Sequence, residues 1–146
     1  MRYIAKKKCD AAAALCAPDD LIITADTMVF LDNDRLGKPR DEEDALRMLR
    51  ALSGRGHTVC TGVSVRRGAQ EERFAVSTRV FFRPMTDDEI RAYIKTGEPM
   101  DKAGAYGVQS RGALFVERID GDFFNVMGLP VEQLGLVLAR FGVKLL

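Results

Sequence analysis

The feature that most constrains the fold is a pair of strand-like segments joined by a short connection. Residues 57–66 (HTVCTGVSVR) and 72–82 (ERFAVSTRVFF) are rich in β-branched and aromatic residues, and the loop between them runs through Arg67-Gly68-Ala69. In the second segment every other residue from Phe74 to Phe82 is apolar or threonine, which is the period of a half-buried strand. Because parallel strands need a long crossover connection, this short loop predicts an antiparallel hairpin.

Helical patterns surround the hairpin and indicate an α/β fold. Four segments have helical spacing or helix-start signals: residues 3–17, residues 41–52, residues 86–95 and the stretch that begins at Pro130. Two further strands are predicted over residues 21–31 and 113–119, and residues 101–112 form a glycine-rich loop. We therefore expect an α/β protein of α+β character, with a mixed sheet flanked by helices.

Length and composition indicate one globular domain over residues 1–146. Hydrophobic residues make up 47% and charged residues 29% of the chain, as in ordinary soluble proteins. The net charge of +1 provides no general attraction for nucleic acid or membranes, so we expect neither as a partner and expect anionic ligands to be bound by local clusters. Apolar runs are too short to span a membrane and no signal peptide is recognisable, so we expect a cytoplasmic protein.

The three cysteines do not predict a metal site or a disulfide framework. The chain has an odd number of cysteines, and none of them forms a CxxC motif: Cys9, Cys16 and Cys60. Cys9 and Cys16 are seven residues apart within the first predicted helix, so they would share one helix face. We expect three buried thiols in a reducing compartment.

Asp26 is the residue that most suggests chemistry. It lies in the otherwise apolar segment 21–31, where a carboxylate is costly unless it is paired, hydrogen-bonded or bound to a metal. Two structural explanations remain open, namely that Asp26 caps the end of a strand or pairs with a lysine.

Two loops carry further candidate residues. Lys38 lies between a glycine and a proline in Gly37-Lys38-Pro39, and a held ammonium group is a good ligand for phosphate, although a solvated surface lysine is the commoner case. The loop Asp101-Lys102-Ala103-Gly104-Ala105-Tyr106-Gly107-Val108-Gln109 combines both charges, small residues and an amide that can pair with a nucleobase. A polar turn loop would look the same. The only histidine, His57, begins a strand, where a structural role is expected.

Taken in order along the chain, these segments resemble the Maf family, the septum-formation-associated nucleotide pyrophosphatases. The resemblance is carried by a series of short motifs: Ile4-Ala5 through Lys8, Ala25-Asp26-Thr27, Gly37-Lys38-Pro39, Leu52-Ser53-Gly54, His57-Thr58-Val59, Thr61-Gly62-Val63, Tyr93-Ile94, Thr96-Gly97-Glu98, residues 101–106, Val108-Gln109, Gly121-Asp122, Asn125-Val126 and Gly128-Leu129-Pro130.

The resemblance implies cleavage of a nucleoside triphosphate between its α and β phosphates, with a divalent cation such as Mg²⁺ or Mn²⁺ as cofactor. It implies that Asp26 activates water or helps to hold the metal, with Asp101 as a second possible metal ligand. It further implies phosphate contacts from lysines and base selection by two polar residues: Lys8, Lys38 and Lys102, and Thr27 and Gln109. A threonine after the aspartate and a glutamine in the late glycine loop resemble the branch that hydrolyses dTTP and UTP. The family resemblance also favours a homodimer.

One family feature has no counterpart in these 146 residues. The family begins with a strand and a loop that reads Ser-x-Ser-Pro-Arg-Arg, ahead of the helix that here starts near Ile4. We therefore expect a domain that lacks its first strand and loop, and weaker activity than the complete arrangement would give. Two alternatives remain: a nucleotide-binding or protein-interaction remnant without catalysis, and an inosine-triphosphate-type pyrophosphatase of similar architecture.

Overall fold

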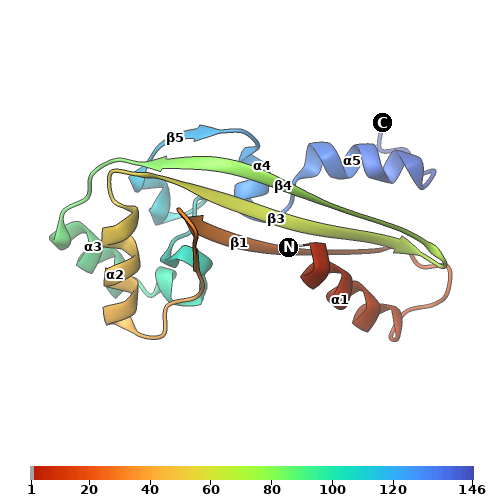
Figure 1. The fold of residues 1–146 in the computed structure, drawn as a ribbon, viewed down its shortest axis with the longest axis horizontal. Coiled ribbons are helices and arrows are strands. Elements are labelled where there is room, and N and C mark those ends of the chain that lie inside the picture. Colours follow the sequence, from red (N-terminus) through yellow and green to blue (C-terminus); the bar gives the residue numbers. More distant parts are fainter. Residues whose placement is uncertain (1) are drawn as a thin grey trace.

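The computed structural model describes residues 2–146 and contains one five-stranded sheet (Figure 1). The strands lie in the order β2-β1-β3-β4-β5, and each neighbouring pair is antiparallel. Their bounds are β1 (Ile22–Leu31), β2 (Asp34–Leu36), β3 (Gly56–Arg67), β4 (Gln70–Phe82) and β5 (Val116–Asp120). The predicted hairpin is confirmed as β3–β4, with residues 56–67 paired to residues 70–81.

Helices and short 3₁₀ turns flank the sheet, which confirms the α/β fold class. The helices are α1 (Arg2–Ala13), α2 (Glu42–Leu52), α3 (Asp87–Lys95), α4 (Phe123–Met127) and α5 (Val131–Arg140). The 3₁₀ turns are η1 (Glu98–Asp101), η2 (Ala103–Ala105) and η3 (Arg111–Phe115). The caps read from the sequence are present: Asp41 accepts from the amide of Asp44, and Thr86 and Glu89 form a capping box.

The two faces of the sheet are covered by different elements. Strand alternation sends the Thr24 side chain toward α1, where its hydroxyl donates to the carbonyl of Ala5, and sends Ala25 toward the apolar cluster formed with α5. Figure 1 shows α1 and α5 on opposite sides of the same end of the sheet. At the other end, α2, α3 and the 3₁₀ turns pack on the face that carries Val29, Val59 and Phe82, which forms the larger core.

Part of strand β1 has a strand neighbour on one side only. Strand β2 pairs with residues 29–31, whereas residues 22–30 pair with β3. Within residues 2–146, the segment 22–28 therefore pairs with β3 alone. Asp26 and Thr27 both lie in this segment.

Several sequence-based boundaries were wrong for local reasons. Helix α1 ends at Ala13, so Cys16 lies beyond the helix and is exposed, although Cys9 is buried as expected and Cys60 is partly buried. The segment predicted as a strand from Ala113 begins as turn η3, and strand β5 starts at Val116. The one-turn helix α4 and the three-residue strand β2 were not foreseen, because elements this short carry no periodic pattern.

Within the described part of the chain, no helix is both long enough and apolar enough to cross a membrane.

Candidate functional site

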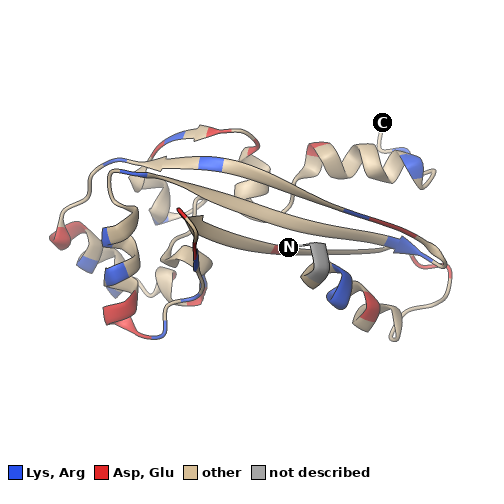
Figure 2. Ribbon diagram, in the orientation of Figure 1, with Lys and Arg blue, Asp and Glu red and all other residues tan. Residues whose placement is uncertain are grey.

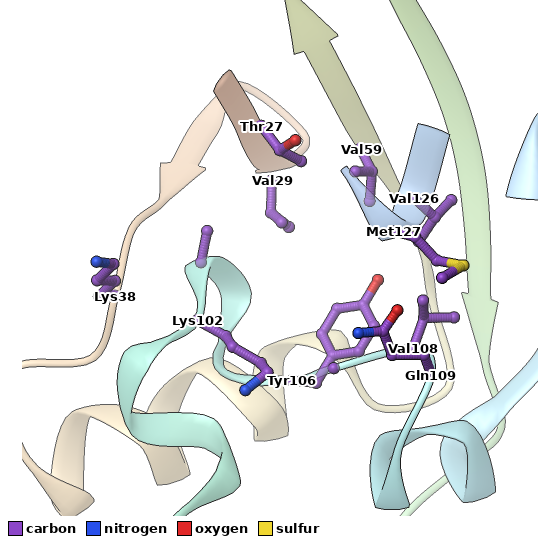
Figure 3. Close-up of a pocket in the computed structure, with 12 residues that line it drawn as sticks. Thr27, Val29, Lys38, Val59, Lys102, Tyr106, Val108, Gln109, Val126 and Met127 are labelled. Carbon is purple, nitrogen blue, oxygen red and sulfur yellow. The ribbon is translucent and has the colours of Figure 1, made fainter. Parts of the chain in front are cut away.

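A pocket of about 270 Å³ opens between strand β1, the loop after β2, turn η2 and helix α4 (Figure 3). It is lined by Thr27, Val29, Lys38, Val59, Lys102, Ala103, Tyr106, Gly107, Val108, Gln109, Val126 and Met127. Four of the residues predicted from the sequence therefore meet here, although they come from three separate segments: Thr27, Lys38, Lys102 and Gln109. Small-molecule sites commonly combine such an apolar lining with a few polar groups.

Two lysines bring positive charge to the pocket. The Lys102 ammonium group donates to the carbonyl of Glu98 at 3.2 Å and to Oδ1 of Asp101 at 2.9 Å. The pKa of Asp101 is lowered, chiefly by this hydrogen bond from Lys102, and the charge of Lys38 adds to the effect. Both lysines therefore lie close enough to act on the same carboxylate. Figure 3 places Lys38 on the side of the pocket away from Gln109, whereas the Lys102 side chain extends toward Tyr106 and passes beside Gly107.

Turn η2 lies close against strand β1, and this brings Lys102 to the pocket. The amide of Gly104 donates to the carbonyl of Gly37 at 3.1 Å, which ties the turn to the loop that carries Lys38. Gly104 has a positive φ of 73°, and a Cβ there would lie only 3.0 Å from a methyl group of Val29. Any other residue would be strained in conformation and crowded against the strand.

Tyr106 forms part of the pocket wall and is held from behind by the only histidine. Nε2 of His57 lies 2.7 Å from the Tyr106 hydroxyl, and the two rings meet edge to face. Burial, and secondarily the charge of Arg79, lowers the pKa of His57 to about 4. His57 is therefore a neutral, fully buried side chain at pH 7. It supports the wall of the pocket and does not line it, in keeping with the structural role expected from the sequence.

Thr27 presents a hydrogen-bond acceptor to the pocket. Its hydroxyl lies 2.9 Å from the hydroxyl of the buried Thr61, which donates its own proton to the carbonyl of Asn125 at 3.1 Å. Because Thr61 has a single proton to donate, Thr27 is the donor in the Thr27–Thr61 bond. The lone pairs of Thr27 are then free to accept from a ligand. Thr61 and Asn125 lie in motifs of the resemblance, but their roles could not be predicted because only the fold brings the two residues together.

Asn125 fixes the position of helix α4 against the sheet. Its side-chain amide donates to the carbonyls of Val59 and Val76 and to the hydroxyl of Thr78, at 3.0 to 3.2 Å. The adjacent residues Val126 and Met127 line the pocket. Three hydrogen bonds to two strands therefore hold this wall in place.

Asp26 and Lys8 meet each other but do not line this pocket. The Lys8 ammonium group lies 2.9 Å from Oδ1 of Asp26 and also donates to the carbonyl of Ala25 at 3.1 Å. The Asp26 side chain is 23% exposed and that of Lys8 is 49% exposed. Because neighbouring residues of a strand point to opposite faces, Asp26 faces α1 whereas Thr27 faces the pocket. The structure thus contains the lysine pairing that the sequence analysis left open as a structural explanation.

The residues present can hold a divalent cation only together with another ligand. Among residues 2–146, no three His, Cys, Asp or Glu side chains are grouped so as to bind a metal. Asp26 is a single, partly exposed carboxylate paired with Lys8, and Asp101 is an exposed carboxylate already paired with Lys102. Magnesium commonly binds through one or two carboxylates, water and substrate phosphates, so this donor set fits a cation that arrives with a polyphosphate.

Charge elsewhere on the molecule is mixed. Figure 2 shows basic and acidic residues interleaved on the helices and at the hairpin end, as expected for a net charge of +1. Attraction for a polyanion therefore depends on the local lysines at the pocket and at α1.

Comparison with known proteins gives matches over most of the chain. A family model described as "Maf-like protein" matches residues 1–141. A Bacillus velezensis protein named dTTP/UTP pyrophosphatase is 50% identical over 144 residues, which are 99% of this chain and 76% of the relative. Proteins of the same name from Bacillus pumilus and Carboxydothermus hydrogenoformans are 46% and 49% identical, over 98% and 95% of this chain and 75% of each relative.

Proposed function

Because this chain belongs to the Maf family, we propose that it is a nucleoside triphosphate pyrophosphatase that acts on dTTP and UTP. The observation that carries the proposal is the make-up of the pocket, in which Lys38 lies far from Gln109, Lys102 lies between them, and Gln109 stands beside the apolar wall (Figure 3). A nucleotide likewise has its charged phosphates at one end and a flat base at the other. The names of the relatives support the choice of substrate.

The proposed reaction is hydrolysis of the anhydride between the α and β phosphates. The oxygen of a water molecule bonds to the α-phosphorus, the bond from that phosphorus to the bridging oxygen breaks, and pyrophosphate leaves. The products are the nucleoside monophosphate and pyrophosphate. Such reactions depend mainly on positioning and on neutralising charge, which lysines and a cation provide.

We propose that Asp26 is the general base that accepts the proton of the attacking water. Its carboxylate is partly exposed on the face of β1 that meets α1, where it pairs with Lys8. Thr27, the next residue, reaches into the pocket from the other face of the strand. For Asp26 to act, the α-phosphate of a nucleotide held in the pocket has to lie beside β1 at Thr27 and Asp26, with the β and γ phosphates beyond it.

A divalent cation, Mg²⁺ or Mn²⁺, is proposed as cofactor. Asp26 is the residue best placed to share it with the phosphate oxygens, and Asp101 is a second candidate beside Lys102. When bound, the cation would neutralise negative charge on the phosphates.

The base preference is attributed to Gln109 and Thr27. The side-chain amide of a glutamine can accept from N3–H and donate to a carbonyl of uracil or thymine, and Thr27 offers a further acceptor. A panel of nucleoside triphosphates compared by kcat/KM tests the assignment, because this ratio measures discrimination between substrates. We expect dTTP and UTP to be the best substrates. A purine nucleotide as the best substrate would refute the assignment, and the absence of pyrophosphate release from every nucleotide would favour a non-catalytic remnant.

A further inference from the structure

The loop segment that carries Gln109 is fastened at both ends to one carboxylate. At the far end, the amides of Arg111 and Gly112 each donate to the Glu98 carboxylate at 3.1 Å, one to each oxygen. At the near end, the amide of Gly107 donates to the hydroxyl of Tyr93 at 3.1 Å, and this hydroxyl in turn donates to Glu98. Residues 108–110 form the turn between these anchors, and Gln109 is exposed at its tip.

The two ends of the segment are also in direct contact. A Cβ on Gly112 would lie only 2.3 Å from the carbonyl oxygen of Gly107 and 2.9 Å from the Tyr93 hydroxyl. The segment 107–112 is thus a closed loop whose neck has room for no further side-chain atom. Movement of the neck would move the tip, because few residues separate them.

The Glu98 carboxylate is ionised in this arrangement, because both of its oxygens accept hydrogen bonds. Burial raises the pKa of Glu98, but hydrogen bonds from Ser110, Tyr93 and the two amides outweigh burial, and the net pKa is lowered. Each carboxylate oxygen can accept more than one bond, so all of these donors are satisfied together. The backbone carbonyl of the same residue accepts from Lys102, a cation of the pocket whose side chain passes beside Gly107.

We propose that Glu98 is a positioning residue for base selection, which holds the Gln109 loop at the distance and orientation needed to read the edge of a pyrimidine. This inference rests on the proposed function. Glu98 itself does not line the pocket, so it acts through the loop and not by contact with the base.

Positioning of this kind matters most when the enzyme has to distinguish uracil from cytosine. The two rings have the same size, but the donor and acceptor at N3 and at the exocyclic group are exchanged between them. A glutamine amide that can rotate by half a turn pairs with either base, since it carries one acceptor and one donor. Glu98 fixes the backbone that carries Gln109, and so limits the directions from which its amide can approach the edge of the base. UTP and CTP also share the ribose and triphosphate, so their ratio of kcat/KM cancels contributions from the phosphate site.

The test compares Glu98→Gln with Glu89→Gln in the full chain. Glu98→Gln keeps the size of the side chain but replaces one acceptor oxygen with a donor, so bonds at the neck are lost. Glu89 is the matched control, because it also accepts a backbone amide, from Thr86, and pairs with Arg83, but it makes no bond to the Gln109 loop. Three quantities are measured: the UTP-to-CTP ratio of kcat/KM, the thermal unfolding temperature, and hydrogen exchange of the amides of residues 107, 111 and 112.

We expect Glu98→Gln to lower the UTP-to-CTP ratio by about tenfold or more and to speed exchange of these amides. Glu89→Gln should lower the unfolding temperature without changing the ratio. In a Gln109→Ala background, which has already lost the reading group, Glu98→Gln should cause no further fall in the ratio, as expected for two residues that act as one unit.

If hydrogen exchange of the amides of residues 107, 111 and 112 were unchanged in Glu98→Gln, Glu98 would not hold the loop in place, whatever the activity of the variant. Faster exchange with an unchanged ratio would overturn the role in selection and leave Glu98 as a structural residue. If the wild-type chain hydrolysed no nucleotide, the proposed function would fail and the selection role with it, whereas the exchange result would still decide whether Glu98 holds the loop.

Discussion

Lys8 on helix α1 and Asp26 on strand β1 form an ion pair, with the ammonium nitrogen 2.9 Å from Oδ1 of the carboxylate. The pair lies on the face of the sheet opposite the pocket, while Thr27 reaches into the pocket from the next position of the same strand. In the proposed enzyme this strand connects the nucleotide pocket to the group that receives the proton. The ion pair therefore has to be distinguished experimentally from a merely structural contact.

Asp26→Asn should abolish most of the activity and leave the fold intact. The substitution keeps the shape but removes the charge, and loss of a general base typically costs about 10²-fold or more in turnover. The unfolding free energy should change by less than about 1 kcal/mol, because the pair is partly exposed. Glu71→Gln is the matched control, since Glu71 also pairs with a lysine of α1, Lys6, but makes no contact with the site. Turnover of Asp26→Asn within a few-fold of Glu71→Gln at saturating metal would rule out the catalytic role.

Thr27 and Thr61 should respond differently to replacement by valine. Thr61→Val removes one of the two donors to the Asn125 carbonyl, which also accepts from the amide of Gly128, and takes away the acceptor of the Thr27 hydroxyl; these buried losses should cost about 1–3 kcal/mol of unfolding free energy. Thr27→Val removes a bond at the pocket surface, so it should cost less stability but lower kcat/KM for UTP. Denaturant unfolding and steady-state kinetics on both variants provide the comparison. A Thr27→Val variant that is the less stable of the two would contradict the assigned direction of the bonds.

The stability of the fold should fall as the pH drops from about 6.5 to about 4. In this range unfolded His57 binds a proton, whereas the folded residue, whose pKa is lowered to about 4, stays neutral. The unfolded state thus binds more protons and is favoured by acid, by up to about 3 kcal/mol over the whole range. Above pH 6.5 the contribution of His57 is complete and constant. Unfolding free energy measured against pH should show this loss between pH 6.5 and 5, where carboxylates contribute little, and His57→Gln should remove it. An identical pH dependence in the variant would contradict the buried neutral state.

Removal of divalent cations should stop turnover without unfolding the protein. No metal-binding group of three ligands exists among residues 2–146, so the proposed cation is recruited together with the triphosphate. A chelator should lower the rate by at least about tenfold, and added Mg²⁺ or Mn²⁺ should restore it. The unfolding temperature without nucleotide should stay the same. A lower unfolding temperature after chelation would indicate a structural metal site that this account lacks, and full activity in chelator would refute the cofactor proposal.

The sequence could predict the elements with strong periodic patterns and several pocket residues, but not their arrangement. The hairpin β3–β4 follows from two alternating segments and a short loop, and helix α3 from its capping box. The motifs around Thr27, Lys38 and Gln109 are contiguous in sequence, so a resemblance could identify them. Because successive side chains of a strand alternate, Asp26 and Thr27 point to opposite faces of the sheet. A series of matching motifs does not show which face each residue occupies.

The roles of residues that act through contacts distant in the chain could not be read from the sequence, even where the residues lie in motifs of the resemblance, as Asn125 and Glu98 do. Asn125 bonds residues 59, 76 and 78, and Glu98 bonds the ends of a loop that it precedes. Each is an ordinary polar residue in its local context, and only the tertiary fold supplies its partners. Cys16 illustrates the opposite error, because a helical pattern was extended past the residue at which α1 ends.

The most direct test of the central claim is the fate of the water oxygen during hydrolysis of UTP. The purified chain is incubated with UTP and Mg²⁺ in ¹⁸O-labelled water, and the products are identified by phosphorus NMR and mass spectrometry. Attack at the α-phosphorus predicts UMP and pyrophosphate in equal amounts, with one labelled oxygen in UMP and none in pyrophosphate. Formation of UDP and phosphate, or label in the pyrophosphate, would contradict the account.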